Sequence, residues 1–227
     1  MRPRAVFFDL DDTLIDRADA FARYVEYLFS RHAEAFPRAT RAAVLAEVHA
    51  LDRRGATDRT VFCKRVTETF PSLGLTPEAL WQDMSTHIPM FVKPDEAVCS
   101  LVERLTRARQ VAVVSNGSAR VQHMKMRYAR LFDLLSDTFL SGEVGAEKPD
   151  ARIFQAALAR VDRAPGDVLH VGDDPERDIA GAARLGMATC WVSHGRPWPY
   201  GLPPPTFTVE RIVGDTGPIE EVLARWT

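Results

Sequence analysis

Three carboxylates crowd together near the start of the chain, directly after an apolar run. In the stretch VFFDLDDTLID, residues 6–16, the apolar segment is followed by Asp9, Asp11 and Asp12. Alternate side chains of an extended chain point to the same side, so this spacing predicts that Asp9 and Asp11 face one way. Asp12 is then turned elsewhere, and we expect it to have a structural role such as local hydrogen bonding.

Three further polar clusters follow later apolar segments. Ser115 and Asn116 stand in the stretch SNG, Lys148 stands in EKPD, and Asp173 and Asp178 stand in GDDPERD. Each cluster comes at the end of a predicted strand or at the start of a predicted helix. Four separate segments of the chain therefore supply polar groups that the fold has to bring together.

A divalent metal ion and a phosphate group suit this set of side chains. Two like unit charges about 4 Å apart repel by about 4 kcal/mol at an effective dielectric constant of about 20, and Lys148 alone cannot neutralise several carboxylates. Mg²⁺ prefers oxygen ligands, and a metal ion beside a lysine favours a dianion such as phosphate. An ionised aspartate can then attack phosphorus, and a second carboxyl group two residues on can transfer the proton.

The elements that must position these groups alternate between short apolar strands and amphipathic helices. We predict strands over residues 4–10, 110–115, 167–171 and 188–192, and helices over residues 95–107, 119–131, 149–161 and 179–185. TFTVERI is interpreted as a last edge strand and PIEEVLARW as a closing helix. This alternation predicts an α/β fold with a doubly wound, Rossmann-like parallel sheet, whose strands present their carboxyl ends along one edge.

Residues 17–94 show a different pattern. They contain amphipathic helical stretches such as FARYVEYLFSRHAEAF and TPEALWQDMSTHI, with no convincing strand between them. We therefore predict an inserted all-helical domain over residues 17–94, with residues 1–16 and 95–227 forming the α/β domain.

The four polar clusters resemble the four motifs of the haloacid dehalogenase superfamily, in their usual order and on the usual strand ends. The resemblance implies that Asp9 is the nucleophile and Asp11 the general acid and base, with Ser115 and Lys148 completing the catalytic set. It further implies the phosphate ligands, which are Thr13, Ser115, Asn116 and Lys148.

The same resemblance implies a Mg²⁺ site. The ion would be held by Asp9, by the backbone carbonyl of Asp11 and by Asp173. Asp178 would support these ligands through hydrogen bonds. Asp174 stands where members of the family often carry Ser, Thr or Asn. Whether Asp174 or Asp178 touches the metal directly stays open at this point.

The helical insertion resembles the cap domain of the subgroup that carries its cap between the first and second motifs. Downstream, the chain is similar to pyrimidine nucleotidases and sugar-acid phosphate phosphatases of this subgroup. The resemblance implies a Mg²⁺-dependent phosphatase that acts on a small phosphomonoester, such as a nucleotide or a sugar phosphate, through a phospho-aspartyl intermediate. The cap would set the substrate, which the motifs do not identify.

Other interpretations are weighed against this one. A 2-haloacid dehalogenase shares the fold and the nucleophile but lacks the second aspartate and needs no metal, so Asp11 speaks against it. A sugar-phosphate mutase would share the phospho-aspartate, and a noncatalytic module would only bind phosphate ligands. A calcium loop is disfavoured because its sixth position is not Gly and its twelfth, Ala20, is not Glu.

Composition restricts the partners. The net charge of −2 argues against binding of a nucleic acid polymer, and no apolar run approaches the roughly 20 residues needed to cross a membrane. The three cysteines are odd in number and lack CxxC spacing, which indicates reduced thiols in a cytoplasmic protein. We expect a small-molecule substrate and either a monomer or a homodimer.

Overall fold

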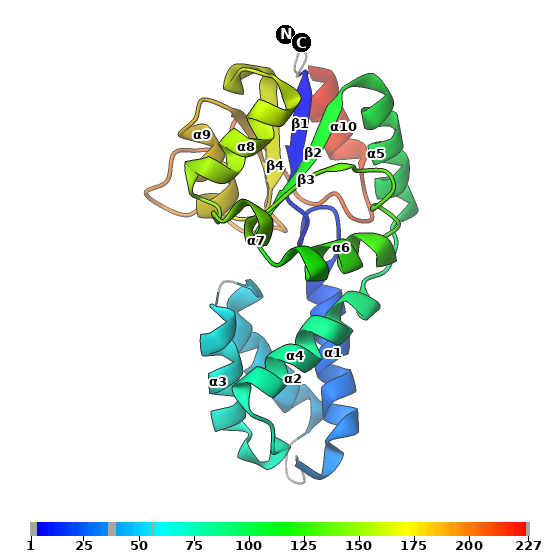
Figure 1. The fold of residues 1–227 in the computed structure, drawn as a ribbon, viewed down its shortest axis with the longest axis vertical. Helices are drawn as coiled ribbons and strands as arrows, with labels where there is room; N and C mark the ends of the chain where they lie inside the picture. Colours follow the sequence, from blue (N-terminus) through cyan, green and yellow to red (C-terminus); the bar gives the residue numbers. More distant parts are fainter. Residues whose placement is uncertain (1–3, 36–39, 56, 226–227) are drawn as a thin grey trace. The chain divides into compact units, whose positions relative to one another are not determined.

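The computed structural model describes residues 4–35, 40–55 and 57–225, and the chain divides into two compact units. One unit combines Met1–Asp16 with Lys93–Thr227, and the other is Arg17–Val92 (Figure 1). The first unit carries the sheet and the second is built from helices. The roles of catalytic core and cap, with the predicted boundaries 1–16, 17–94 and 95–227, remain predictions.

A six-stranded parallel sheet forms the centre of the first unit, in the order β3-β2-β1-β4-β5-β6. Its strands are β1 (Ala5–Phe8), β2 (Gln110–Ser115), β3 (Asp137–Leu140), β4 (Val168–Gly172), β5 (Ala188–Val192) and β6 (Phe207–Val209). In the register, Phe8 at the end of β1 lies opposite Val113 of β2 and Val171 of β4. The predicted α/β fold with a parallel sheet is confirmed, and the strand order reverses at β1, where sheets of this type bind ligands.

Helices cover both faces of the sheet. They are α5 (Glu96–Ala108), α6 (Ala119–Tyr128), α7 (Ser141–Val144), α8 (Ala151–Val161), α9 (Gly181–Ala183) and α10 (Gly217–Arg225), with a 3₁₀ turn at Pro165–Asp167 and a π-helical turn at Pro175–Ala180. Figure 1 shows α8 and α9 on one side of the sheet and α5 and α10 on the other. Ile153 and Phe154 of α8 pack against Phe7 of β1 and Ala112 of β2 in the apolar core.

The first predicted strand is too long. We predicted it over residues 4–10, but β1 ends at Phe8, and Leu10 lies in a bend. Asp12 then adopts a left-handed backbone conformation with φ of 56°, which an aspartate tolerates better than most residues. The alternation expected of an extended chain therefore does not reach Asp11, whose position is set by its contacts.

Two other elements differ from the prediction. The strand β3 was missed because it is short and mostly half-buried, so its sequence DTFL lacks the continuous apolar character of the central strands. The helix predicted over residues 179–185 is instead the π-helical turn at Pro175–Ala180 followed by the short α9. Here Asp174 caps the turn by accepting hydrogen bonds from the amides of Glu176 and Arg177.

The second unit consists of helices joined by short turns throughout its described residues. The helices are α1 (Arg17–Arg31), α2 (Arg41–Asp52), α3 (Arg59–Thr69) and α4 (Pro77–His87), with 3₁₀ turns at Ala33–Ala35, Arg53–Gly55, Pro71–Leu73 and Ile88–Phe91. The apolar sides of α1 and α3 meet where Phe21 contacts Phe62 edge to face. Among the helices described in either unit, none combines the length and the apolar character that crossing a membrane requires.

A buried ion cluster holds three helices of the second unit together. Asp52 at the end of α2 is 1 % exposed and accepts two hydrogen bonds of 2.8 Å from Arg17 of α1. Arg59 of α3 and the amide of Gly55 each donate a further bond of 2.8 Å. Burial alone would raise the pKa of Asp52, but the two guanidinium groups outweigh it, and the pKa lies below its usual value of 3.8.

We expect Asp52→Asn to lower the free energy of unfolding by about 3 kcal/mol. The positive charge of Arg17 would remain buried, while Asn is neutral and offers only one acceptor oxygen in place of two. The folded-state pKa of Asp52 is depressed, so its stabilisation is complete above the unfolded-state pKa and is lost as pH falls through the folded-state value. Urea unfolding at neutral pH and in acid measures both effects. Asp19→Asn removes an exposed partner of Arg23 and serves as the control, with an expected loss below about 1 kcal/mol. Equal losses in the two variants would contradict the role of Asp52.

Candidate active site

Asp9 lies directly beyond the carboxyl end of the central strand β1. Its amide donates to the carbonyl of Val171 at 2.8 Å, which continues the pairing of β1 with β4 by one residue. The residue is 6 % exposed, and one carboxylate oxygen accepts a hydrogen bond of 2.6 Å from the Nζ of Lys148. The predicted nucleophile is therefore held by the strand on one side and by the predicted lysine on the other.

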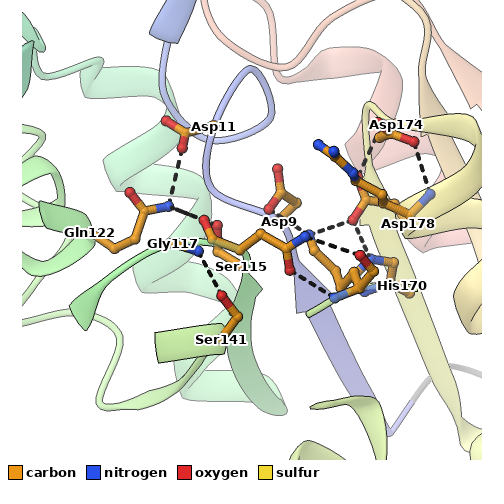
Figure 2. A network of polar contacts seen from close by, with 12 residues as sticks. Asp9, Asp11, Ser115, Gly117, Gln122, Ser141, His170, Asp174 and Asp178 are labelled. Carbon is orange, nitrogen blue, oxygen red and sulfur yellow. Dashed lines mark hydrogen bonds and ion pairs between the residues drawn. The ribbon is translucent and has the colours of Figure 1, made fainter. Parts of the chain in front are cut away.

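Lys148 joins Asp9 to the fourth motif. Its Nζ lies 2.6 Å from an oxygen of Asp178, and the same oxygen lies 3.1 Å from the Nε2 of His170. The second oxygen of Asp178 accepts the amide of Asp174 at 3.0 Å (Figure 2). Both carboxylate oxygens of Asp178 thus accept hydrogen bonds from other residues of the chain. This agrees with the prediction that Asp178 supports the metal ligands.

The two carboxylates that contact Lys148 have pKa values shifted in opposite directions. Burial raises the pKa of Asp9; Lys148 opposes this, and the charges of Asp178 and Asp11 add to it. Burial acts on Asp178 as well, yet its pKa lies far below the usual value because Lys148 and His170 stabilise the charged form. Burial would lower the pKa of Lys148, but its two carboxylate partners raise it. Asp178 therefore acts as the permanent counter-ion of the lysine.

Asp9, Asp173 and Asp178 form a group that could hold a metal ion. Each offers one carboxylate oxygen, and these oxygens lie within 4.8 Å of one another. Burial, followed by the charges of Asp178 and Asp9, raises the pKa of Asp173 to about 8. A buried set of hard oxygen donors whose mutual repulsion is only partly offset by Lys148 fits a divalent cation such as Mg²⁺. The direct ligands stay a prediction; the side chain of Asp174 is used to cap its own turn.

Position 172, the first residue of the GD pair, requires glycine for a steric reason. A Cβ atom at Gly172 would lie 2.3 Å from the Cγ of Asp178 and 2.5 Å from one of its oxygens. The carboxylate of Asp178 therefore occupies the space that any larger residue at position 172 would need, and only Gly permits the close approach.

Asp11 faces a different set of partners from Asp9. Its two carboxylate oxygens each lie 2.7 Å from the Nζ of Lys125, and one of them accepts a hydrogen bond of 3.1 Å from the Nε2 of Gln122. The same nitrogen donates to the Oγ of Ser115 at 2.9 Å, so that Gln122 lies between Asp11 and Ser115 in Figure 2. The predicted acid and base and the predicted phosphate ligand are therefore linked through α6.

Three residues of this network stand outside the four sequence motifs and were not predicted as part of the site. Gln122, Lys125 and His170 are each at most 7 % exposed, although polar residues on a helix or strand are usually interpreted as solvated or structural. A signal was present for the helix, because Gln122 and Lys125 are spaced i, i+3 and fall on one face directly after the second motif. His170 offered no signal beyond its position in a buried strand.

Asn116 and Thr13 were predicted as phosphate ligands. The Oδ1 of Asn116 accepts the amide of Lys148 at 2.8 Å and its Nδ2 donates to the carbonyl of Lys148 at 3.1 Å, so that Asn116 positions the lysine. Thr13 is completely buried, and its Oγ1 has no hydrogen-bond partner among the residues that the structure describes. Phosphate contacts of both residues stay predictions.

The end of β5 and the turn that follows it hold two of the site loops through hydrogen bonds to their backbone. His194 lies with its Nε2 2.6 Å from the carbonyl oxygen of Asp12. Arg196 donates to the carbonyl of Asp173 at 2.7 Å, and the indole of Trp191 donates to the same carbonyl at 2.9 Å. The backbone beside Asp11 and at Asp173 is thereby held by a third segment of the chain.

Comparison with known proteins identifies the family. The profile of the haloacid dehalogenase-like hydrolases matches residues 3–186. The chain belongs to this family. The resemblance inferred from the four motifs is thus confirmed, and with it the assignment of the chain as a hydrolase.

Curated relatives within the haloacid dehalogenase-like family include several phosphatases. A phosphoserine phosphatase of Thermus thermophilus is 38 % identical over 44 % of this chain and 40 % of its own length. The pyrimidine 5'-nucleotidase YjjG of Escherichia coli is 31 % identical over 62 % of this chain and 63 % of its own, so the chain spans less than two thirds of either relative. The N-acylneuraminate-9-phosphatase of Mus musculus is 28 % identical over 93 % of this chain and 92 % of its own.

Solved structures of the family share the fold. The hydrolase YfnB of Bacillus subtilis, solved with bound magnesium, has a TM-score of 0.78 and 22 % identity, covering 99 % of this chain and 100 % of that one. L-2-haloacid dehalogenase of Xanthobacter autotrophicus, solved with covalently bound chloropropionic acid, has a TM-score of 0.71 and 16 % identity, covering 99 % of each chain. At such identities these matches show the fold alone.

Proposed function

We propose that the protein is a Mg²⁺-dependent phosphomonoesterase that works through a phosphorylated Asp9. The observation that carries this proposal is the buried contact of Asp9 with Lys148, beside Asp173 and Asp178, at the carboxyl ends of β1 and β4. The carboxylates would bind the cation, and the bound cation together with Lys148 would favour a dianionic phosphate over a neutral or singly charged substrate. The phosphatases among the curated relatives support the same reaction class.

In the proposed reaction an oxygen of Asp9 attacks phosphorus while the bond from phosphorus to the leaving oxygen breaks. Asp11 donates its proton to that leaving oxygen and later takes a proton from the water that hydrolyses the phospho-aspartate. The ammonium of Lys148 and the hydroxyl of Ser115 stabilise the phosphoryl oxygens. Because the Oγ of Ser115 accepts a hydrogen bond from Gln122, the hydroxyl hydrogen is available for this purpose.

Asp9, Asp173 and the backbone carbonyl of Asp11 would hold Mg²⁺, and Asp178 would support them through Lys148 and the amide of Asp174. When bound, the ion would neutralise phosphoryl charge and favour the ionised form of the buried carboxylates. The chain's own residues orient the phosphate, exclude water and move the proton.

We expect phosphate release to need the metal. Phosphate released from a panel of nucleotides, sugar phosphates and phosphoserine is measured with Mg²⁺ and after treatment with EDTA. Removal of the ion should lower the rate at least about a hundredfold, because several kcal/mol of charge stabilisation are lost. Added Mg²⁺ should also raise the melting temperature, since it binds only the folded carboxylate group. Unchanged phosphate release in EDTA would contradict the proposed metal site.

The same panel separates the alternatives. Chloride release from 2-chloropropionate without Mg²⁺ would indicate a dehalogenase, an alternative that the presence of Asp11 two residues after Asp9 argues against. An isomerised sugar phosphate with little free phosphate would indicate a mutase. Thermal stabilisation by phosphate esters with no turnover would indicate a noncatalytic binding module.

We infer a small phosphate ester as the substrate, with pyrimidine nucleotides and sugar-acid phosphates as the first candidates, supported by the activities named for the curated relatives. The three cysteines Cys63, Cys99 and Cys190 are free and buried, which supports a cytoplasmic enzyme. A monomer and a homodimer are both compatible with this proposal.

A further inference from the structure

One polar side chain of α6, that of Gln122, is buried beside the second motif and makes or breaks no bond in the reaction proposed above. The residue is 1 % exposed, whereas glutamine usually lies at the surface. Burying an amide is unfavourable unless its polar atoms find hydrogen-bond partners. Gln122 finds two of them on Ser115 and Asn116, the residues at the end of β2.

The amide nitrogen of Gln122, rather than its oxygen, faces these two residues. The Nε2 lies 3.1 Å from the backbone carbonyl oxygen of Asn116, and a carbonyl oxygen can only accept a hydrogen bond. The same nitrogen lies 2.9 Å from the Oγ of Ser115, as Figure 2 shows. Because an amide NH₂ group only donates, the hydroxyl of Ser115 must be the acceptor in this hydrogen bond.

A hydroxyl that accepts a hydrogen bond from Gln122 still has its own hydrogen to donate. Among the residues that the structure describes, Gln122 is the only hydrogen-bond partner of the Ser115 hydroxyl. Ser115 is also 1 % exposed, so water does not readily compete for this hydrogen. The amide hydrogen of Gln122 repels the hydroxyl hydrogen, which therefore turns to the other side of the oxygen. Ser115 is thus prepared as a donor, and a phosphoryl oxygen is an acceptor.

The side chain of Gln122 is itself held in place. Its backbone amide donates to the carbonyl of Ser118 at 3.0 Å, at the start of α6. A Cβ atom at Gly117 would lie 3.2 Å from the Cδ of Gln122, so the turn before the helix packs directly against this side chain. That turn is fixed in its own right, because the amide of Gly117 donates to the hydroxyl of Ser141 at 2.9 Å. A side chain packed in this way keeps one rotamer, and its Nε2 stays beside Ser115.

We propose that Gln122 is a positioning residue that makes the hydroxyl of Ser115 a hydrogen-bond donor to the transferred phosphoryl group. The inference rests on the phosphomonoesterase function proposed above and adds one residue to it. A hydroxyl without this partner samples several rotamers, and in some of them its lone pairs face the phosphoryl oxygens and repel them. Gln122 excludes those rotamers before the substrate binds, so the donor needs no reorientation as charge develops.

A double-mutant cycle tests whether Gln122 acts through Ser115. The measured quantity is kcat/KM for 4-nitrophenyl phosphate and for the ester of the panel that is hydrolysed fastest. Ser115→Ala alone should lower it about a hundredfold, as for the loss of one donor to developing negative charge. Gln122→Met should cost about tenfold more when Ser115 is present than in the Ser115→Ala background, as for other residues in direct contact. An effect that runs through the contact of Gln122 with Asp11 persists in both backgrounds and cancels.

Two further measurements keep the test independent of folding. The inhibition constant of inorganic phosphate does not depend on the amount of folded enzyme, and it should rise with the same lack of additivity. Gln122→Glu has the shape of the wild-type side chain but accepts where Gln122 donates, so it would capture the hydroxyl hydrogen. Its cycle with Ser115→Ala should show a coupling of the same sign, and it serves if Gln122→Met does not fold.

His123 provides the control cycle. It is the next residue of the same helix, but its side chain contacts the hydroxyl of Thr138 and the ring of Phe132. The losses caused by His123→Met and Ser115→Ala should therefore simply multiply. If those of Gln122→Met and Ser115→Ala also multiply, or if Ser115→Ala keeps wild-type activity, this inference is overturned while the phosphomonoesterase function stands. If the wild type releases phosphate from no ester, both fail.

Discussion

Replacement of Asp9 by Asn is expected to lower phosphate release by about four orders of magnitude or more, since removing the nucleophile of a catalytic set commonly costs this much. The amide of Asn has the size of the carboxylate but cannot attack phosphorus. Lys148 would keep its second carboxylate partner, Asp178, at 2.6 Å. Because burial raises the pKa of Asp9 and so disfavours its charge, the neutral variant should fold as stably as the wild type.

The measurement is phosphate release at saturating substrate, together with thermal unfolding. Asp133→Asn removes an exposed carboxylate of the same unit and should keep full activity. Acid-quenched wild type should carry a phosphoryl group on the peptide that contains Asp9, and the variant should carry none. Wild-type turnover by Asp9→Asn would show that another group attacks phosphorus.

Gly172→Ala is expected to damage both stability and activity, although it adds a single methyl group. The new Cβ would lie 2.3 Å from the Cγ of Asp178, far inside van der Waals contact, so the carboxylate has to move. Asp178 would then leave its position against Lys148, His170 and the amide of Asp174. We expect a loss of about 1–3 kcal/mol in the free energy of unfolding, as for other overpacked sites. We also expect about a hundredfold lower kcat, because small displacements at a catalytic site are costly.

Gly166→Ala is the matched control. Gly166 precedes the same strand, and a Cβ atom there would meet nothing within 4 Å, so the substitution should leave stability and activity close to those of the wild type. Denaturant unfolding and steady-state kinetics of the two variants measure the difference. A Gly172→Ala protein with normal kcat would show that the position of Asp178 is not critical.

The sequence allowed the fold and much of the candidate site to be predicted because both depend on topology. Asp9, Lys148 and Asp178 are far apart in the chain, yet parallel strands and right-handed crossovers require their segments to meet at one edge of the sheet. The structure brings the three together within hydrogen-bonding distance. The strands at residues 110–115 and 188–192 were predicted with the observed bounds because their apolar runs are continuous.

What the sequence could not predict depends on contacts between side chains. The positions of Asp11 and Asp12 were inferred from the alternation of an extended chain, but the bend at Leu10 and the left-handed Asp12 interrupt it. Gln122 and Lys125 look like ordinary polar residues of an amphipathic helix, and only the buried contact with Asp11 distinguishes them. The sequence pattern predicts which face of a helix or strand a residue occupies. It does not predict which side chain of another element contacts that residue, because this depends on tertiary packing.

The end of β5 and the turn after it contact the backbone of the site loops, and Arg196 also contacts one carboxylate oxygen of Asp173 at 3.1 Å. His194 meets the carbonyl oxygen of Asp12, and Trp191 and Arg196 both meet the carbonyl oxygen of Asp173. A carbonyl oxygen belongs to the main chain and persists whatever side chain the residue carries. The acidic residues of these loops can therefore be exchanged, by evolution or by design, while the loops keep this external support. The support that this segment gives to the two loops therefore does not depend on which acidic side chains they carry.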